Sequence, residues 1–157
     1  MKILLAVDGS AHTKKMLAYL ATHMETLGRD NEFTALTVEP PLPPRARSIV
    51  GKDVADSFHA ESAEKVLAPV TKFLERHDVN LKTVFKVGPA GETIATFAES
   101  GKFDLLIMGS HGHGALGNLV IGSVATKVLA TCKVPVLLVR SGVGRKLQFL
   151  AAAALGR

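Results

Sequence analysis

Residues 104–139 read DLLIMGSHGHGALGNLVIGSVATKVLATCKVPVLLV, and they combine two short apolar runs with a glycine-rich loop and a helix start. The apolar runs, at 105–108 and 136–139, are typical of buried strands. Between them, three glycines and a serine follow the pattern G-x2-G-x9-G-S: Gly109, Gly112, Gly122 and Ser123. Glycine lets backbone amides approach an anion, and a helix N-terminus attracts one. This stretch therefore predicts a phosphate-binding loop between two strands.

Strand and helix patterns alternate along the rest of the chain. Apolar runs predict five strands, at 2–7, 33–38, 81–87, 105–108 and 136–139. Helix patterns separate them, and Ser10 is a suitable N-cap for the first helix. A long amphipathic stretch follows the second strand, and we expect Pro69 to kink or break it. Connections of this length suit parallel strands with right-handed crossovers. The sequence thus predicts an α/β fold with a doubly wound, five-stranded parallel sheet of order 3-2-1-4-5.

This strand order indicates where a ligand would bind. In doubly wound sheets, ligands bind beyond the carboxyl ends of the strands, at the crevice where the strand order reverses. The ends of the first and fourth strands would meet there, so we expect Asp8 and Gly109 to flank the same crevice. For Asp8 two interpretations stay open, because an aspartate after a strand either caps the following helix or contacts the ligand.

Composition excludes several classes of protein. The chain has 157 residues, of which 47% are hydrophobic and 21% charged, as in a single domain with a sizeable core. The first apolar run stops at Asp8, before the length of about 7–15 residues that a signal peptide needs. We therefore expect a cytoplasmic protein without a membrane partner. The single cysteine, Cys132, is interpreted as a small core residue.

The formal net charge of +5 does not by itself indicate a nucleic-acid partner. Nucleic-acid-binding proteins gather Lys and Arg on one face, commonly with aromatic side chains for stacking. Here basic residues are scattered along the chain and aromatic residues make up 5% of it. We expect no nucleic-acid partner.

Four blocks of sequence carry a family resemblance: ILLAVDGS at 3–10, ALTVEP at 35–40, VGPAGETI at 87–94, and the loop and helix at 104–129 followed by PVLLV. Together they resemble the nucleotide-binding branch of the universal stress protein family, over residues 1–140. The resemblance implies a fold like that of the adenine nucleotide alpha hydrolases, and a C-terminal extension at 141–157 outside the domain. We expect this extension to be flexible or helical.

The same resemblance implies ATP as the ligand, with or without Mg²⁺ or Mn²⁺, and a set of nucleotide-binding residues. In relatives that bind ATP, the glycine loop holds the phosphates, which here assigns them to the amides of Gly122, Ser123 and Val124. Asp8 would contact the ribose, and the backbone of Val38 the adenine edge. The full set is Ala6, Val7, Asp8, Thr37, Val38, Met108, Gly109, His111, Gly112, Gly122, Ser123 and Val124. His111 and His113 match an H-x-H pair, but without further ligands at a fixed spacing we assign no metal site.

The function implied is that of a nucleotide-dependent stress-response switch, with at most slow ATP hydrolysis or autophosphorylation and an unidentified protein partner. No catalytic residue is assigned. One alternative is an adenylating enzyme of the same superfamily, although the chain lacks the S-G-G-x-D-S and H-x-G-H motifs. Another is a protein-interaction module without nucleotide. Relatives commonly pair through the last strand, so we expect a homodimer through residues 136–139, where an exposed edge would otherwise invite pairing.

Overall fold

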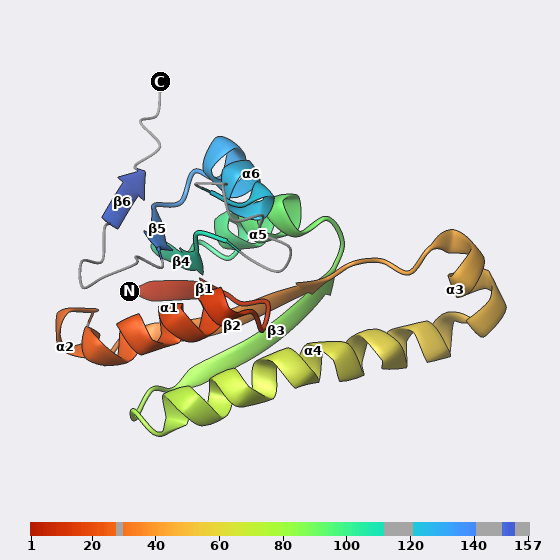
Figure 1. Cartoon of the computed structure of the whole chain (residues 1–157), viewed down its shortest axis with the longest axis horizontal. Coiled ribbons are helices and arrows are strands. Elements are labelled where there is room, and N and C mark those ends of the chain that lie inside the picture. The colour runs from red at the N-terminus through yellow and green to blue at the C-terminus, as the bar shows by residue number, and fades with distance from the viewer. Residues whose placement is uncertain (28–29, 112–120, 141–148, 153–157) are drawn as a thin grey trace.

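A computed structural model describes residues 1–27, 30–111, 121–140 and 149–152 of the chain (Figure 1). Within these residues, six strands form one sheet in the order β3-β2-β1-β4-β5-β6. Their bounds are Lys2–Ala6 for β1, Glu32–Glu39 for β2, Leu81–Val87 for β3, Leu105–Gly109 for β4, Val136–Val139 for β5 and Phe149–Ala152 for β6. The first five strands are parallel. The predicted order 3-2-1-4-5 is confirmed.

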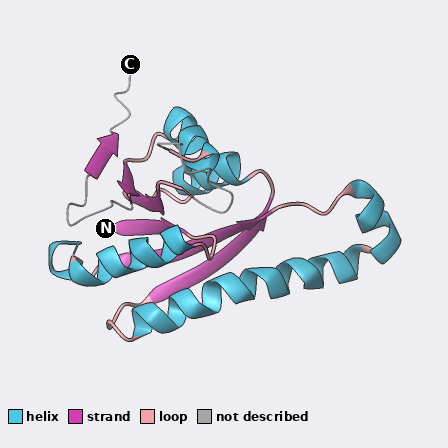
Figure 2. Cartoon of the chain, viewed as in Figure 1, coloured by secondary structure: helices cyan, strands magenta, loops and turns pink. Residues whose placement is uncertain are grey.

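The helices cover both faces of the sheet (Figures 1 and 2). Their bounds are Ala11–Thr22 for α1, Met24–Leu27 for α2, Pro44–Val50 for α3, Lys52–Glu75 for α4, Ala90–Ser100 for α5 and Ser123–Thr131 for α6. Side chains of α1 and α4 pack on one face, with Ile3 and Leu5 of β1. Those of α5 and α6 pack on the other, with Leu4 and Ala6. Strands β1, β4 and β5 are largely buried between these helix layers, so they appear in the sequence as short apolar runs, whereas the edge strand β3 is mostly exposed and carries polar residues.

Two further core features agree with the sequence. Cys132 is buried in the cluster beneath α5 and α6, and burial raises the pKa of its thiol, as suits a small core residue. Ser10 is the N-cap of α1, where its hydroxyl accepts hydrogen bonds from the amides of His12 and Thr13. Among the described residues, no helix has the length and apolar character needed to cross a membrane.

The sequence predicts a kink or break at Pro69, and the break does not occur. Helix α4 runs without interruption from Lys52 to Glu75, and the chain breaks instead at Gly51, between α3 and α4. Gly51 has φ +81°, which side-chain-bearing residues rarely adopt. Proline removes one backbone donor from a helix. On either side of Pro69, the buried residues Leu67 and Val70 pack against the sheet, and this packing holds the helix together.

The C-terminal extension also departs from the expectation of a flexible or helical segment, because four of its residues form β6. This strand pairs antiparallel with β5, from Val139 opposite Phe149 to Val136 opposite Ala152. Strand β5 therefore has a neighbour on both sides, and the prediction that it is the edge strand is wrong. Hydrogen bonding to an open strand has overridden the helix propensity of this alanine-rich segment.

Candidate functional site

The carboxyl ends of β1 and β4 lie side by side. Ala6 of β1 is paired with Met108 of β4, and Asp8 and Ser110 each lie two residues beyond this pair. Beyond the strands, the amide of Ser110 donates to the carbonyl of Val139 on β5 at 3.1 Å. The structure thus places Asp8 and Gly109 at the carboxyl ends of neighbouring strands, where the sequence predicts the ligand crevice, although a hundred residues of sequence separate them.

Asp8 shapes the turn that begins α1. Its Oδ1 accepts hydrogen bonds from the amide of Ser10 at 2.9 Å and from Oγ1 of Thr13 at 2.8 Å. The Asp8 amide in turn donates to Thr13 Oγ1 at 3.1 Å. These bonds support the helix-capping interpretation of Asp8. Contact with a ribose stays a prediction for this half-buried carboxylate.

Gly109 allows a close approach of α1 to the end of β4. A Cβ at this position would lie 3.0 Å from Cβ of His12 and 3.2 Å from the carbonyl oxygen of His111. Both distances are tighter than ordinary van der Waals contact. The glycine is therefore needed here for packing between α1 and β4, whether or not a ligand also approaches it.

The start of α6 lies beside the end of β4, and the helix packs on the face of the sheet opposite α1. The amide of Gly122, its N-cap, donates to the carbonyl of Ser110 at 2.8 Å, which fixes the helix start next to the end of β4. No side chain among the described residues caps this helix. The amides of Ser123 and Val124 lie in its first turn, where the helix dipole attracts an anion. Ser123 is exposed and Val124 is half-buried.

The residues predicted around the adenine are more enclosed. Ala6, Val7, Thr37 and Met108 are at most 8% exposed, so their contact with a ligand stays a prediction. Val38 is half-buried.

Next to Val38, Glu39 is the last residue of β2. The sequence alone did not identify it as a buried polar residue. It is buried, and its carboxylate accepts a hydrogen bond from Ser62 of α4 at 2.7 Å.

Two of the residues singled out from the sequence, Gly112 and His113, lie outside the described part of the chain. Lys127, which follows the cap of α6 by one turn, forms an ion pair with Glu92 of α5 at 3.0 Å. A Cβ on Gly91 would lie 2.7 Å from Cβ of Lys127, so α5 and α6 are in close contact there. Lys127 is thus engaged with the neighbouring helix.

A pair of histidines lies at the crevice, and the sequence analysis identified one of them. The rings of His12 and His111 are 5.2 Å apart between centroids, and Oγ of Ser110 lies 3.0 Å from Nδ1 of His111. Burial lowers the pKa of His12, and the positive charges of His111 and Lys15 lower it further, while Asp8 opposes them. His12 was missed because its position depends on how α1 crosses Gly109, which the pattern of α1 does not specify.

The depressed pKa of His12 predicts a loss of stability in acid. The folded chain holds this proton less tightly than the unfolded chain, so stability is present above the ordinary histidine pKa of about 6.5 and is lost as the pH falls below it. We expect His12→Gln to lose less stability than the natural sequence between about pH 7.5 and pH 5 in urea unfolding. Equal losses in the two proteins would contradict the assignment.

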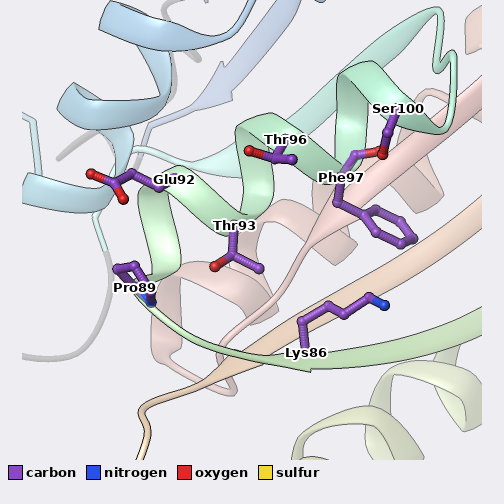
Figure 3. Close-up of a pocket in the computed structure, with 7 residues that line it drawn as sticks. All are labelled: Lys86, Pro89, Glu92, Thr93, Thr96, Phe97 and Ser100. Atoms are coloured by element: carbon purple, nitrogen blue, oxygen red, sulfur yellow. The ribbon is translucent and has the colours of Figure 1, made fainter.

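A separate hollow of about 390 Å³ lies between α5 and β3 (Figure 3). It is lined by Lys86, Pro89, Glu92, Thr93, Thr96, Phe97 and Ser100. The ammonium of Lys86 lies 5.8 Å from the centre of the Phe97 ring, within cation–π range. None of the residues predicted to bind nucleotide lines this hollow, and it is not the crevice at the ends of β1 and β4.

Comparison with known proteins agrees with this architecture. The model of the universal stress protein family matches residues 1–140, and the chain belongs to this family. It is 34% identical to a universal stress protein of Thermus aquaticus, covering 88% of this chain and 97% of that one. It is also 34% identical to the universal stress protein Slr1230 of Synechocystis, again over 88% of this chain. The chain spans 42% of the length of that second relative.

Solved structures share the fold. The hypothetical protein MJ0577 of Methanocaldococcus jannaschii superimposes with a TM-score of 0.77 at 27% identity, over 91% of this chain and 97% of that one. A universal stress protein family protein of Arabidopsis thaliana, solved with AMP bound, superimposes with a TM-score of 0.65 at 17% identity, over 91% of this chain and 93% of that one.

Proposed function

We propose that this chain binds an adenine nucleotide, with ATP as the principal ligand, at the crevice between β1, β4 and the start of α6. We propose that the bound nucleotide acts as a switch in a cytoplasmic response to stress. A ligand that binds only the folded chain stabilises it, so the stability of the chain would depend on whether nucleotide is bound. The observation that carries the proposal is the start of α6, which the Gly122–Ser110 hydrogen bond holds beside the end of β4 and whose first-turn amides lack a side-chain cap in the described structure. The AMP-bound Arabidopsis relative, which shares the fold, supports it.

We propose at most slow hydrolysis for this site. Rapid phosphoryl transfer requires groups that position water and neutralise the developing charge, usually together with Mg²⁺. The described residues contain no group of three histidine, cysteine or acidic side chains that could hold a metal ion. A Mg²⁺ or Mn²⁺ ion bound here would therefore take its ligands mainly from the nucleotide phosphates and water, as Mg²⁺ commonly does.

A negative charge at Ser123 tests the phosphate site directly. We expect Ser123→Asp to weaken ATP binding at least about tenfold, because the carboxylate would repel the phosphates at close range. The helix itself should be unharmed, since a negative charge in the first turn of a helix is favourable. Ser123→Asn, of similar size and uncharged, is the matched control and should stay within about threefold of the natural sequence. Isothermal titration with ATP, ADP and cyclic AMP measures both variants.

The outcomes separate the alternatives. Binding of a nucleotide that Ser123→Asp weakens and Ser123→Asn preserves would support the proposal, and ATP at a hundredfold excess over Kd should then add about 2.7 kcal/mol of stability. Formation of an adenylated product with a second substrate would favour the adenylating enzyme. Absence of binding heat with all three nucleotides, together with an unchanged melting temperature, would favour the protein-interaction module.

We also propose that a homodimer through Val136–Val139 forms only when β6 leaves this strand. In the structure, the residues of β6 pair with the side of β5 that a second copy would need. The extension to which β6 belongs lies beyond the family match, which ends at residue 140. In this proposal, the extension controls whether the chain associates with itself.

A further inference from the structure

We propose that His12 and His111 together bind the phosphate groups of the nucleotide and take up a proton as they do so, which makes the site select triphosphate over monophosphate as the pH falls. This inference rests on the proposed function and concerns the regulation of the same site. It assigns a binding role to His12, a residue outside the predicted nucleotide-binding set.

The two rings lie at the end of β4, next to the residue that holds the start of α6, where the proposed function puts the phosphates. His12 lies in the first turn of α1, and its Cβ packs at the position that a side chain on Gly109 would need. His111 follows β4, and the residue before it, Ser110, accepts the Gly122 amide that begins α6. The pair therefore lies next to the strand end and to the residue that fixes the start of α6.

The charges around the pair explain why a proton would accompany the ligand. Asp8 and Lys15 are the other described groups that act on His12, and their opposite charges offset each other. With both rings neutral, the described side chains that act on His12 offer phosphate little net positive charge. Two protonated rings 5.2 Å apart repel each other without a ligand. A bound polyphosphate removes this penalty, because its negative charge favours the protonated form of each ring.

The selectivity for triphosphate follows from the greater negative charge of ATP compared with AMP. An imidazolium interacts more strongly with a ligand that carries more negative charge. Binding one proton with the ligand changes affinity by up to tenfold per pH unit, and we expect ATP to bind about fivefold more tightly near pH 6 than near pH 7.5. For AMP, with a single phosphate, we expect a change below about twofold.

The test measures Kd for ATP and AMP near pH 6 and pH 7.5, at constant ionic strength, in the full chain and in the double variant His12→Gln, His111→Gln. Phosphate groups themselves titrate near pH 6, so the pH dependence that remains in the double variant reports the ligand. His77→Gln is the matched control. His77 packs on Phe73 between the end of α4 and the start of β3, on the side of the sheet where the parallel strands begin, away from their carboxyl ends. Proton uptake is read independently from NMR titration of the imidazole signals with and without ATP.

The inference is supported if the double variant loses most of the pH dependence of ATP binding, the His77 variant keeps it, and the pKa of His12 rises when ATP binds. It is overturned if ATP binds with the same pH dependence in the double variant, an outcome that leaves nucleotide binding itself intact. If neither nucleotide binds at either pH, the proposed function fails together with it. Urea unfolding of the variants confirms that each is folded.

Discussion

Replacing Ile107 with alanine should lower the free energy of unfolding by about 2–5 kcal/mol. Ile107 is fully buried in β4, with Leu5 of β1 on one side and Leu137 of β5 on the other. Its neighbours are held by strand pairing on both sides, so they have little freedom to fill the cavity that the missing atoms leave. For a chain of this length, the melting temperature should fall by roughly 5–15 °C.

The same substitution at an exposed position provides the control. Ile49 lies on α3 with 79% of its surface exposed, and Ile49→Ala should change stability by less than about 0.5 kcal/mol. Urea unfolding followed by circular dichroism measures both variants. Equal losses at the two positions would show that β4 does not lie at the centre of the sheet.

The central strands could be predicted because β1, β4 and β5 are short apolar runs bounded by residues that end strands, while β2 and β3 alternate apolar and polar residues in part. Asp8 and Gly9 follow the first, and Pro135 precedes the last, whose predicted bounds, residues 136–139, are those of β5. Helical segments separate the strands, and parallel strands need long connections that cross over in the right-handed sense. Few strand orders satisfy both conditions. The meeting of Asp8 and Gly109 at one crevice followed from that order.

The helices were predicted less well, because their ends depend on local backbone conformation and on packing. A proline inside a helix removes one backbone hydrogen bond, which is why the sequence suggests a break at Pro69. The buried residues on either side of Pro69 nevertheless keep α4 continuous. The break at Gly51 depends on a positive φ that the sequence permits without requiring. Likewise His23, a residue of no special helix-ending character, separates α1 from α2.

The strand ends that border the candidate site were predicted, whereas the contact of His12 depends on helix placement and was missed. The nucleotide-binding residues themselves stay a prediction. Glycines and a serine at fixed spacing are visible in the sequence, so Gly109, Gly122 and Ser123 could be assigned before the fold was known. The contact of His12 with His111 joins two segments whose relative rotation only the packed structure defines. Strand β6 is a similar case, because an alanine-rich segment has no strand pattern of its own and pairs according to the edge available to it.

Removing residues 141–157 should convert the chain from a monomer to a dimer at micromolar concentration. Without β6, the outer backbone groups of β5 would lose their partners, while Val136 and Leu138 keep the strand apolar. An unpaired apolar edge is a template for another strand, and two copies of β5 can pair across a twofold axis. The truncated chain should fold, because the described members of both hydrophobic clusters all lie between Ile3 and Val139.

A shorter deletion isolates the contribution of β6. Removing residues 153–157 shortens the chain but leaves the pairing of Phe149–Ala152 with β5 in place, so this variant should remain monomeric like the full chain. Light scattering after gel filtration and sedimentation velocity give the mass of all three proteins. Dimers formed equally by all three would show that β6 does not govern association. A monomeric chain after removal of 141–157 would show instead that β5 alone is insufficient as an interface, since four residues present few backbone hydrogen bonds to offset the entropy lost on association.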